Sequence, residues 1–138
     1  MVPIGRAAVR RPGDDVTVVA LGGMVGPALA AADRAAAEGI DAEVIDPRTL
    51  VPLDVAAIVR SVVHTGRLVT VEEGPLMHGF GGEVVARVVE TLPPSSLRSR
   101  PRRVAGRDVP IPYARALERA AVPDADRVLA ALRSVMGG

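Results

Sequence analysis

The sequence alternates short apolar segments, typical of strands, with longer segments that have helical spacing. Few folds accommodate this alternation. Residues 16–21 are β-branched and apolar on both faces, and Gly22 and Gly23 close the run. Residues 42–46 and 67–72 repeat the pattern, the first ending at Pro47 and the second broken by residues 73–75. A run that is apolar on both faces is typical of a strand buried in a parallel sheet, because helices cover both faces of such a sheet. Residues 102–105 predict a further short strand.

Helical spacing of apolar residues separates these strands. We expect helices over residues 27–38, 52–64 and 83–92, and a last helix whose N-cap is Asp124. Strands that alternate with helices predict right-handed crossovers and a parallel sheet. The sequence therefore predicts an α/β fold: a three-layer, doubly wound and mostly parallel sheet.

Length and apolar content suit one domain. The chain has 138 residues, of which 49% are hydrophobic, and this is enough for one substantial core. Residues 1–12 mix Pro, Gly and Arg before a turn, so we interpret them as a linker arm that leads into the domain and holds at most an edge strand over residues 7–10. Residues 13–138 form the domain itself.

Composition argues against several classes of function. The chain has no Cys, which removes disulfides, thiolate catalysis and cysteine metal sites. Its basic residues are all Arg and its net charge is +1, so neither nucleic acid nor a membrane surface is indicated as a partner. No stretch approaches the roughly 20 apolar residues of a membrane helix. We expect a cytoplasmic protein.

The glycine-rich turn at residues 22–26 is one candidate binding site. It lies between a predicted strand and a predicted helix, and Asp46 ends the next strand, as in a dinucleotide-binding fold. Leu21, however, stands where that motif requires its first glycine. The alternative function is therefore a stand-alone module that binds an anion or nucleotide at this helix N-terminus, and the structural interpretation is a simple turn.

His78 and Glu73 are the candidates for acid–base catalysis. Glu73 follows a predicted strand at the edge where open α/β sheets place functional groups, and His78 lies in the loop beyond it. No nucleophile or set of metal ligands accompanies them in the sequence. Beyond these two candidates for an independent enzyme, we assign no catalytic, cofactor-binding or metal-binding residue.

Several segments match one family in order and spacing: residues 3–7, 13–19, 39–54, 65–73, 79–84 and 106–114, followed by Leu117 and Glu118. They resemble the C-terminal domain of transketolase-like enzymes. The most similar form is the beta chain of the thiamine-diphosphate-dependent first component of 2-oxo-acid dehydrogenase complexes, such as pyruvate dehydrogenase. The resemblance covers essentially the whole chain. One departure is Gly82, where relatives commonly have Ala, and we expect it to loosen the helix start.

The resemblance implies a division of labour. In that family two other domains bind thiamine diphosphate and Mg²⁺, while the C-terminal domain typically builds the dimer interface and helps dock the acyltransferase core. We therefore expect a non-catalytic assembly or dimerisation domain of an oxidoreductase or transferase, inactive alone and binding no cofactor itself. Its partners would be the cofactor-binding subunits or domains, in a homodimer or hetero-oligomer. The start at Met1 and Val2 favours a separately encoded piece of a split enzyme over an excised domain.

Two segments are the predicted contact surfaces, the loop 73–83 and the segment 108–113. Two prolines in the second segment fix an extended backbone at low ordering cost, although a tight crossing loop is the alternative. The candidate contact residues are Glu73, His78, Phe80, Gly81, Glu83, Asp108, Pro110, Pro112 and Tyr113.

Overall fold

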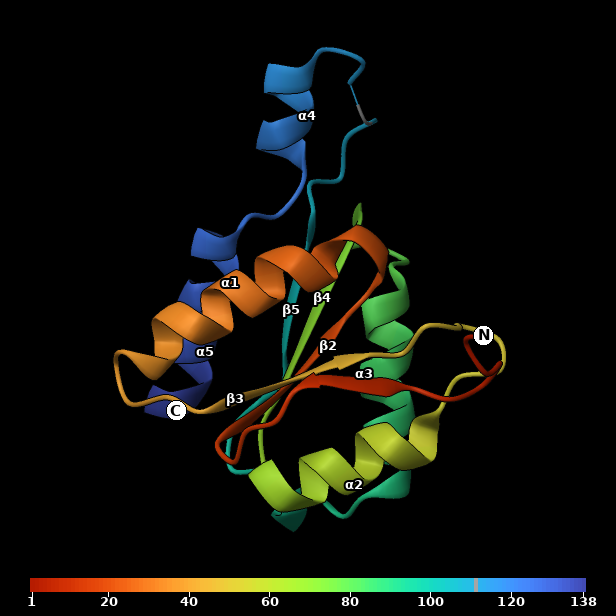
Figure 1. Cartoon of the computed structure of the whole chain (residues 1–138), viewed down its shortest axis with the longest axis vertical. Coiled ribbons are helices and arrows are strands. Elements are labelled where there is room, and N and C mark those ends of the chain that lie inside the picture. Colours follow the sequence, from red (N-terminus) through yellow and green to blue (C-terminus); the bar gives the residue numbers. More distant parts are fainter. Residues whose placement is uncertain (111) are drawn as a thin grey trace.

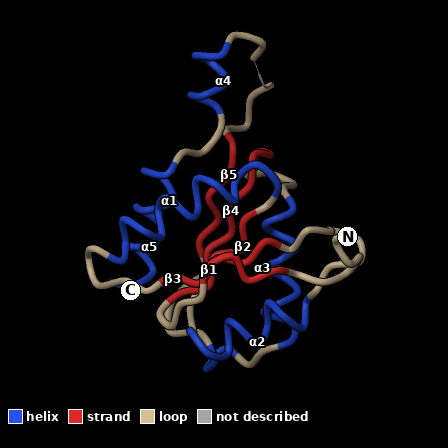
Figure 2. Tube along the Cα trace, viewed as in Figure 1, coloured by secondary structure: helices blue, strands red, loops and turns tan. Residues whose placement is uncertain are grey.

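One sheet with helices on both faces forms the body of the computed structural model (Figures 1 and 2), which describes residues 1–110 and 112–138. The strand order is β1-β3-β2-β4-β5. β3, β2, β4 and β5 run parallel to one another, and β1 lies antiparallel to β3 at the edge. The strands are β1 (Ala8–Arg11), β2 (Val16–Ala20), β3 (Ala42–Asp46), β4 (Leu68–Pro75) and β5 (Arg102–Gly106). The predicted α/β fold is confirmed.

Helices pack on both faces of the sheet. α1 (Val25–Ala36) and α5 (Ala125–Gly137) pack together on one face, and α2 (Val55–Thr65) and α3 (Phe80–Thr91) on the other. The buried positions of α1 are mostly alanine, which lets this helix lie close to the sheet and to Leu129 and Leu132 of α5. Asp124 is the N-cap of α5, as predicted, and its Oδ1 accepts the amide of Arg127 at 2.9 Å.

The largest differences from the sequence prediction lie in three elements. β4 continues to Pro75, which pairs with Gly106, although we expected residues 73–75 to break the strand. α3 begins at Phe80, before the predicted start at residue 83, because Glu72 binds its first amides. α4 (Arg115–Ala121) was not predicted at all, since its residues are almost all exposed and form no face that packs on this chain.

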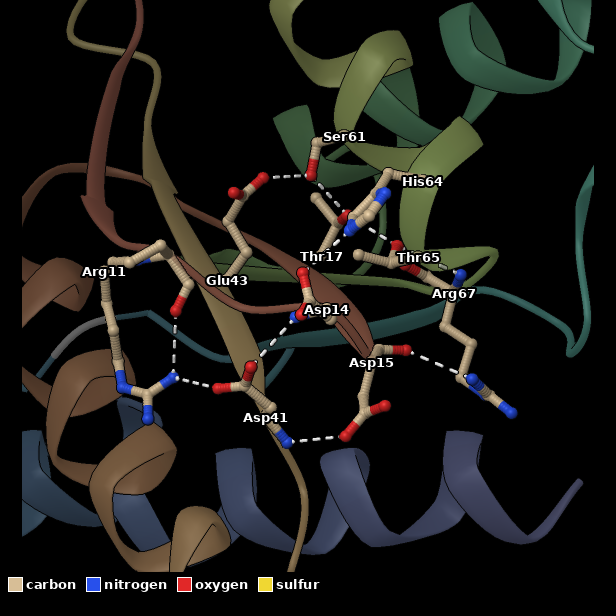
Figure 3. Close-up of polar contacts among 11 residues, drawn as sticks. Arg11, Asp14, Asp15, Thr17, Asp41, Glu43, Ser61, His64, Thr65 and Arg67 are labelled. Atoms are coloured by element: carbon tan, nitrogen blue, oxygen red, sulfur yellow. Dashed lines mark hydrogen bonds and ion pairs between the residues drawn. The ribbon is translucent and has the colours of Figure 1, made fainter.

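A chain of hydroxyl groups fastens α2 to the sheet near the amino ends of β2 and β3 (Figure 3). Oγ1 of Thr17 lies 2.5 Å from Oγ of Ser61 and 2.8 Å from Oγ1 of Thr65. Ser61 in turn donates to the carboxylate of Glu43. These hydroxyls are buried, so the bonds offset the cost of removing them from water.

Acidic residues at the same edge are already bonded within the chain (Figure 3). Asp15 accepts the amide of Asp41 at 2.8 Å, and Asp14 lies 2.7 Å from Nε2 of His64. Several polar groups at the amino ends of the strands are therefore bonded to one another, whereas the candidate site lies at the opposite edge of the sheet.

The N-terminal arm is held by the cap of α2. Its strand β1 lies one residue beyond the predicted edge strand. Asp54 is the N-cap of α2, and its Oδ1 accepts the amide of Ala57 at 3.1 Å while Oδ2 accepts that of Ala7 at 3.0 Å. The bond from Ala7, and then the bond from Ala57, lower the pKa of the Asp54 carboxyl below its ordinary value of 3.8.

We expect Asp54→Asn to lower the free energy of unfolding at neutral pH by about 1 kcal/mol, because the charge at the helix start is lost. The folded pKa lies below the unfolded one. The carboxylate therefore stabilises fully above the unfolded pKa, and this contribution is lost as the pH falls through the folded pKa. Urea unfolding at a series of acidic pH values should show the difference between wild type and variant shrinking. A difference that widens toward acid contradicts this account, and Glu90→Gln on the exposed face of α3 serves as the control.

Candidate functional site

The carboxyl ends of β2, β3 and β4 meet at one edge of the sheet, and the residues that follow them line two adjoining hollows. In open α/β sheets this is the edge where ligands bind. Leu50 and Phe80 line both hollows and form the ridge between them. The first hollow, of about 860 Å³, is also lined by Arg10, Gly22, Asp46, Arg48, Glu72 and Glu73. The second, of about 840 Å³, is also lined by Leu53, His78, Glu83, Arg87 and Arg103.

Glu72, and not Glu73, is the carboxylate that shapes this edge. Only 5% of Glu72 is exposed. Its side chain accepts the amides of Phe80 and Gly81, both at 2.9 Å. The first amides of a helix have no partner within the helix, and a negative charge there also interacts favourably with the helix dipole. Glu72 therefore fixes the start of α3 against the end of β4.

Glu73 and His78, the candidates for acid–base catalysis, are both exposed. Glu73 lines the first hollow and a further one beneath α4. His78 lines the second hollow and a small one beside Asp108. In the described part of the chain, no hydrogen bond or ion pair joins the two side chains. The geometry therefore gives the hypothesis of an independent enzyme no support.

The glycine-rich turn at residues 22–26 begins α1 through a short 3-10 turn over Gly22–Met24. The carboxylate of Glu73 lies against Gly23, where a side chain of that residue would stand. Asp46 is also engaged, because it lies 3.5 Å from Arg10 and accepts the amide of Arg48 at 2.9 Å. A carboxylate at this helix start repels an incoming phosphate, so the anion-binding alternative finds no support in the geometry.

Of the other predicted contact residues, some are packed or bonded within the domain and others are exposed at its surface. Phe80 is half-buried against the core, and Gly81 is buried beside Glu72. Glu83 is exposed and lies 3.7 Å from Arg87. Asp108 holds the loop after β4, since it accepts the amide of Met77 at 3.2 Å. Pro110, half-buried Pro112 and fully exposed Tyr113 lead to α4, while Ile111 between the prolines lies outside the described residues.

Sequence reasoning missed two structural features of this region. The first is the role of Glu72, which the alternation along β4 could have indicated, because Thr70 and Glu72 share the face that α3 covers. The second is α4, for which the sequence offered no helical pattern facing a core. Among the described residues, no group of acidic or His side chains could hold a metal ion, and no helix is long and apolar enough to cross a membrane.

Gly81 and Gly82 provide a matched test of the capped helix start. A Cβ on Gly81 would lie 2.6 Å from Oγ1 of Thr70 and 2.7 Å from Oε1 of Glu72, whereas one on Gly82 would meet only the flexible end of Arg103 at 3.2 Å. We expect Gly81→Ala to lower the free energy of unfolding by about 1–3 kcal/mol. Gly82→Ala should instead raise it by up to about 1 kcal/mol, since Ala is favoured over Gly within a helix. Equal effects in urea unfolding would show that the Glu72 contact does not set this packing.

Comparisons with known proteins agree with the fold. The family model described as the transketolase C-terminal domain matches residues 5–128. Over 130 residues the chain is 51% identical to the pyruvate dehydrogenase E1 component subunit beta-1 of Arabidopsis thaliana, covering 94% of this chain and 36% of that protein. Over 138 residues it is 46% identical to the corresponding beta subunit of Drosophila melanogaster, covering 100% and 38%. A solved split gene transketolase, an inactive beta4 tetramer, has a TM-score of 0.85 at 35% identity, covering 99% of this chain and 44% of that one.

The chain thus spans little more than a third of the length of the curated relatives that it matches. Identity of about half along almost the whole chain confirms the resemblance to beta subunits of the pyruvate dehydrogenase first component. The matched residues run from the N-terminal arm into α5, and so include every strand and, apart from Val2, the residues that line the two hollows at the carboxyl edge. The chain belongs to the transketolase C-terminal domain family.

Proposed function

We propose that this domain is a non-catalytic assembly unit of a thiamine-diphosphate-dependent enzyme, a 2-oxo-acid dehydrogenase first component or a transketolase-like enzyme. In this proposal other subunits or domains hold thiamine diphosphate and Mg²⁺, and this chain binds neither. Its contribution is to bring those parts together in a homodimer or hetero-oligomer.

The segment that carries α4 is the observation on which the proposal rests most. We define the α4 segment as residues 107–110 and 112–124, which project from the body of the domain (Figure 1). Residues 115–120 are all exposed, and the helix begins without a side-chain cap. An isolated helix shorter than about 12 residues is marginal in water, so such a segment needs a second surface to stabilise it.

Apolar side chains on the α4 segment indicate what that surface would bury. Tyr113 is fully exposed, and Leu117 is 59% exposed on the helix itself. Val109 is also exposed at the base of the segment, next to exposed Met77. Apolar and aromatic side chains of this kind form the buried centre of protein interfaces. They favour a protein partner over a small ligand.

The polar groups at the carboxyl edge also favour assembly over catalysis. Glu72 caps α3, Asp46 is bonded to Arg10 and to the amide of Arg48, and Arg103 donates to the carbonyl of Leu76 at 3.0 Å. These groups are satisfied within the chain, so they are not poised to act on a substrate. The relatives named as beta subunits and as a split transketolase support the same interpretation.

We expect the double variant Tyr113→Ser and Leu117→Ser to lose co-elution with the cofactor-binding parts of the enzyme. The chain would be expressed together with those parts, and assembly followed by size-exclusion chromatography. Turnover of pyruvate would be followed with thiamine diphosphate, Mg²⁺ and an artificial electron acceptor. Turnover should fall with assembly, because the partner surface loses its apolar contacts, while the melting temperature of the isolated domain stays unchanged.

Val63→Ser is the matched control, since Val63 is equally exposed, at 59%, but lies on α2. It should leave both co-elution and turnover intact. Cofactor-binding parts that turn over pyruvate equally well without this chain would refute the proposal. So would turnover by the isolated chain.

A further inference from the structure

We propose that a strip of arginines at the start of β5 binds an extended acidic segment of a partner protein. The arginine strip is defined as Arg98, Arg100, Arg102 and Arg103, all of which are exposed. It lies on the chain that leads into the edge strand of the sheet, away from α4. The inference stands apart from the proposed function, because it concerns a different surface and holds whatever the α4 segment contacts.

The strip carries charge that the chain does not neutralise. Between Glu90 and Asp108 there are five arginines and no acidic residue, although the net charge of the whole chain is only +1. Among the other arginines of the described residues, five lie within 4 Å of a carboxylate of the same chain, and the remaining ones, such as Arg6 and Arg60, do not. The five paired ones are Arg10, Arg11, Arg34, Arg87 and Arg133. No such pair forms at the strip within the described residues. The guanidinium of Arg103 donates to the carbonyl of Leu76 at 3.0 Å, but a neutral carbonyl leaves its charge in place, so four uncompensated positive charges lie within six residues of the chain.

The backbone of the strip is held rigidly. The amide of Arg98 donates to the carbonyl of Gly66 at 2.7 Å. Arg102 and Arg103 lie in the parallel ladder opposite Val69 and Thr70. Binding therefore requires ordering of side chains only, which lowers its entropic cost.

The direction of the side chains favours an extended occupant. Arg102 and Arg103 are neighbours in a strand and so point to opposite faces of the sheet. A segment that lies along the sheet edge can reach both, whereas a compact anion on one face can reach only one. We do not expect the partner segment to pair with β5 as an additional strand beyond Arg103. Residues 104–106 are buried, and the carbonyl of Ala105 already accepts Nη2 of Arg127 at 2.7 Å.

The chemistry favours carboxylates on a polypeptide over nucleic acid. Guanidinium groups form paired, charge-assisted hydrogen bonds with carboxylates. Single-stranded nucleic acid is usually held by aromatic side chains on which its bases stack. The chain has one Phe and one Tyr, and neither belongs to the strip. Glutamate or aspartate side chains spaced along a partner segment fit the strip better.

A short fluorescent oligo-glutamate peptide is the probe, and fluorescence anisotropy at low salt gives its affinity for the whole chain. The double variant Arg100→Gln and Arg102→Gln should bind it about three- to tenfold more weakly, given the usual size of exposed ion pairs. The control Arg6→Gln and Arg60→Gln changes the net charge equally but lies off the strip, and it should leave the affinity unchanged. Added salt should weaken binding of the wild type.

Any of the following results would overturn the proposal. Equal loss in both double variants, or no loss in either, would show that the strip is no site. Tighter binding of a single-stranded oligonucleotide of matched charge would replace the acidic protein with nucleic acid. Unchanged peptide binding together with new self-association of the strip variant would show that the arginines only prevent edge-to-edge pairing of sheets. Thermal unfolding would establish that every variant is folded.

Discussion

The buried carboxylate of Glu72 is the contact on which the carboxyl edge of this domain depends. A charge removed from water is costly unless it is hydrogen-bonded, and here the first amides of α3 supply the bonds. The contact also explains the glycines of the loop, because a Cβ on Gly79 or Gly81 would collide with Oε1 of Glu72. Strand end, tight loop and helix start therefore form one unit. That unit places Phe80 between the two hollows and leaves Glu73 and His78 at the surface.

Local patterns predicted the buried strands well and failed where a distant contact decides the backbone. β3 occupies residues 42–46 as expected, since its β-branched run ends at Pro47. At the end of β4, Gly74 and Pro75 are residues that usually end a strand, and we expected them to do so. Pairing of Pro75 with Gly106 instead extends the strand. Glu73 lies at the carboxyl edge of the sheet as expected, but the sequence analysis did not indicate that the preceding carboxylate, Glu72, faces α3. α4 could not be predicted, because its apolar residue Leu117 faces away from this chain.

The ion pairs of the described residues lie mostly at the surface of the domain. Exposed ion pairs such as Arg34 with Asp126, at 2.6 Å, contribute little to the free energy of unfolding. Their main consequence is that they remove charge from the surfaces that carry them. The surface of α1 and α5 is neutralised in this way, whereas the start of β5 is not. Electrostatic complementarity sets orientation and association rate between proteins, so an uncompensated strip marks a preferred direction of approach.

The two surfaces complement each other physically. The α4 segment offers apolar contact without a fold-stabilising core behind it, and so gains most when a partner buries it. The arginine strip carries positive charge on a rigid strand. This charge would attract and orient an acidic partner at long range, but it would bury little apolar surface. Several polar groups at the carboxyl edge, among them Glu72, Asp46 and Arg103, are already bonded, which fits the proposed role of holding other chains in place. The reactive chemistry would then come from residues that those chains supply.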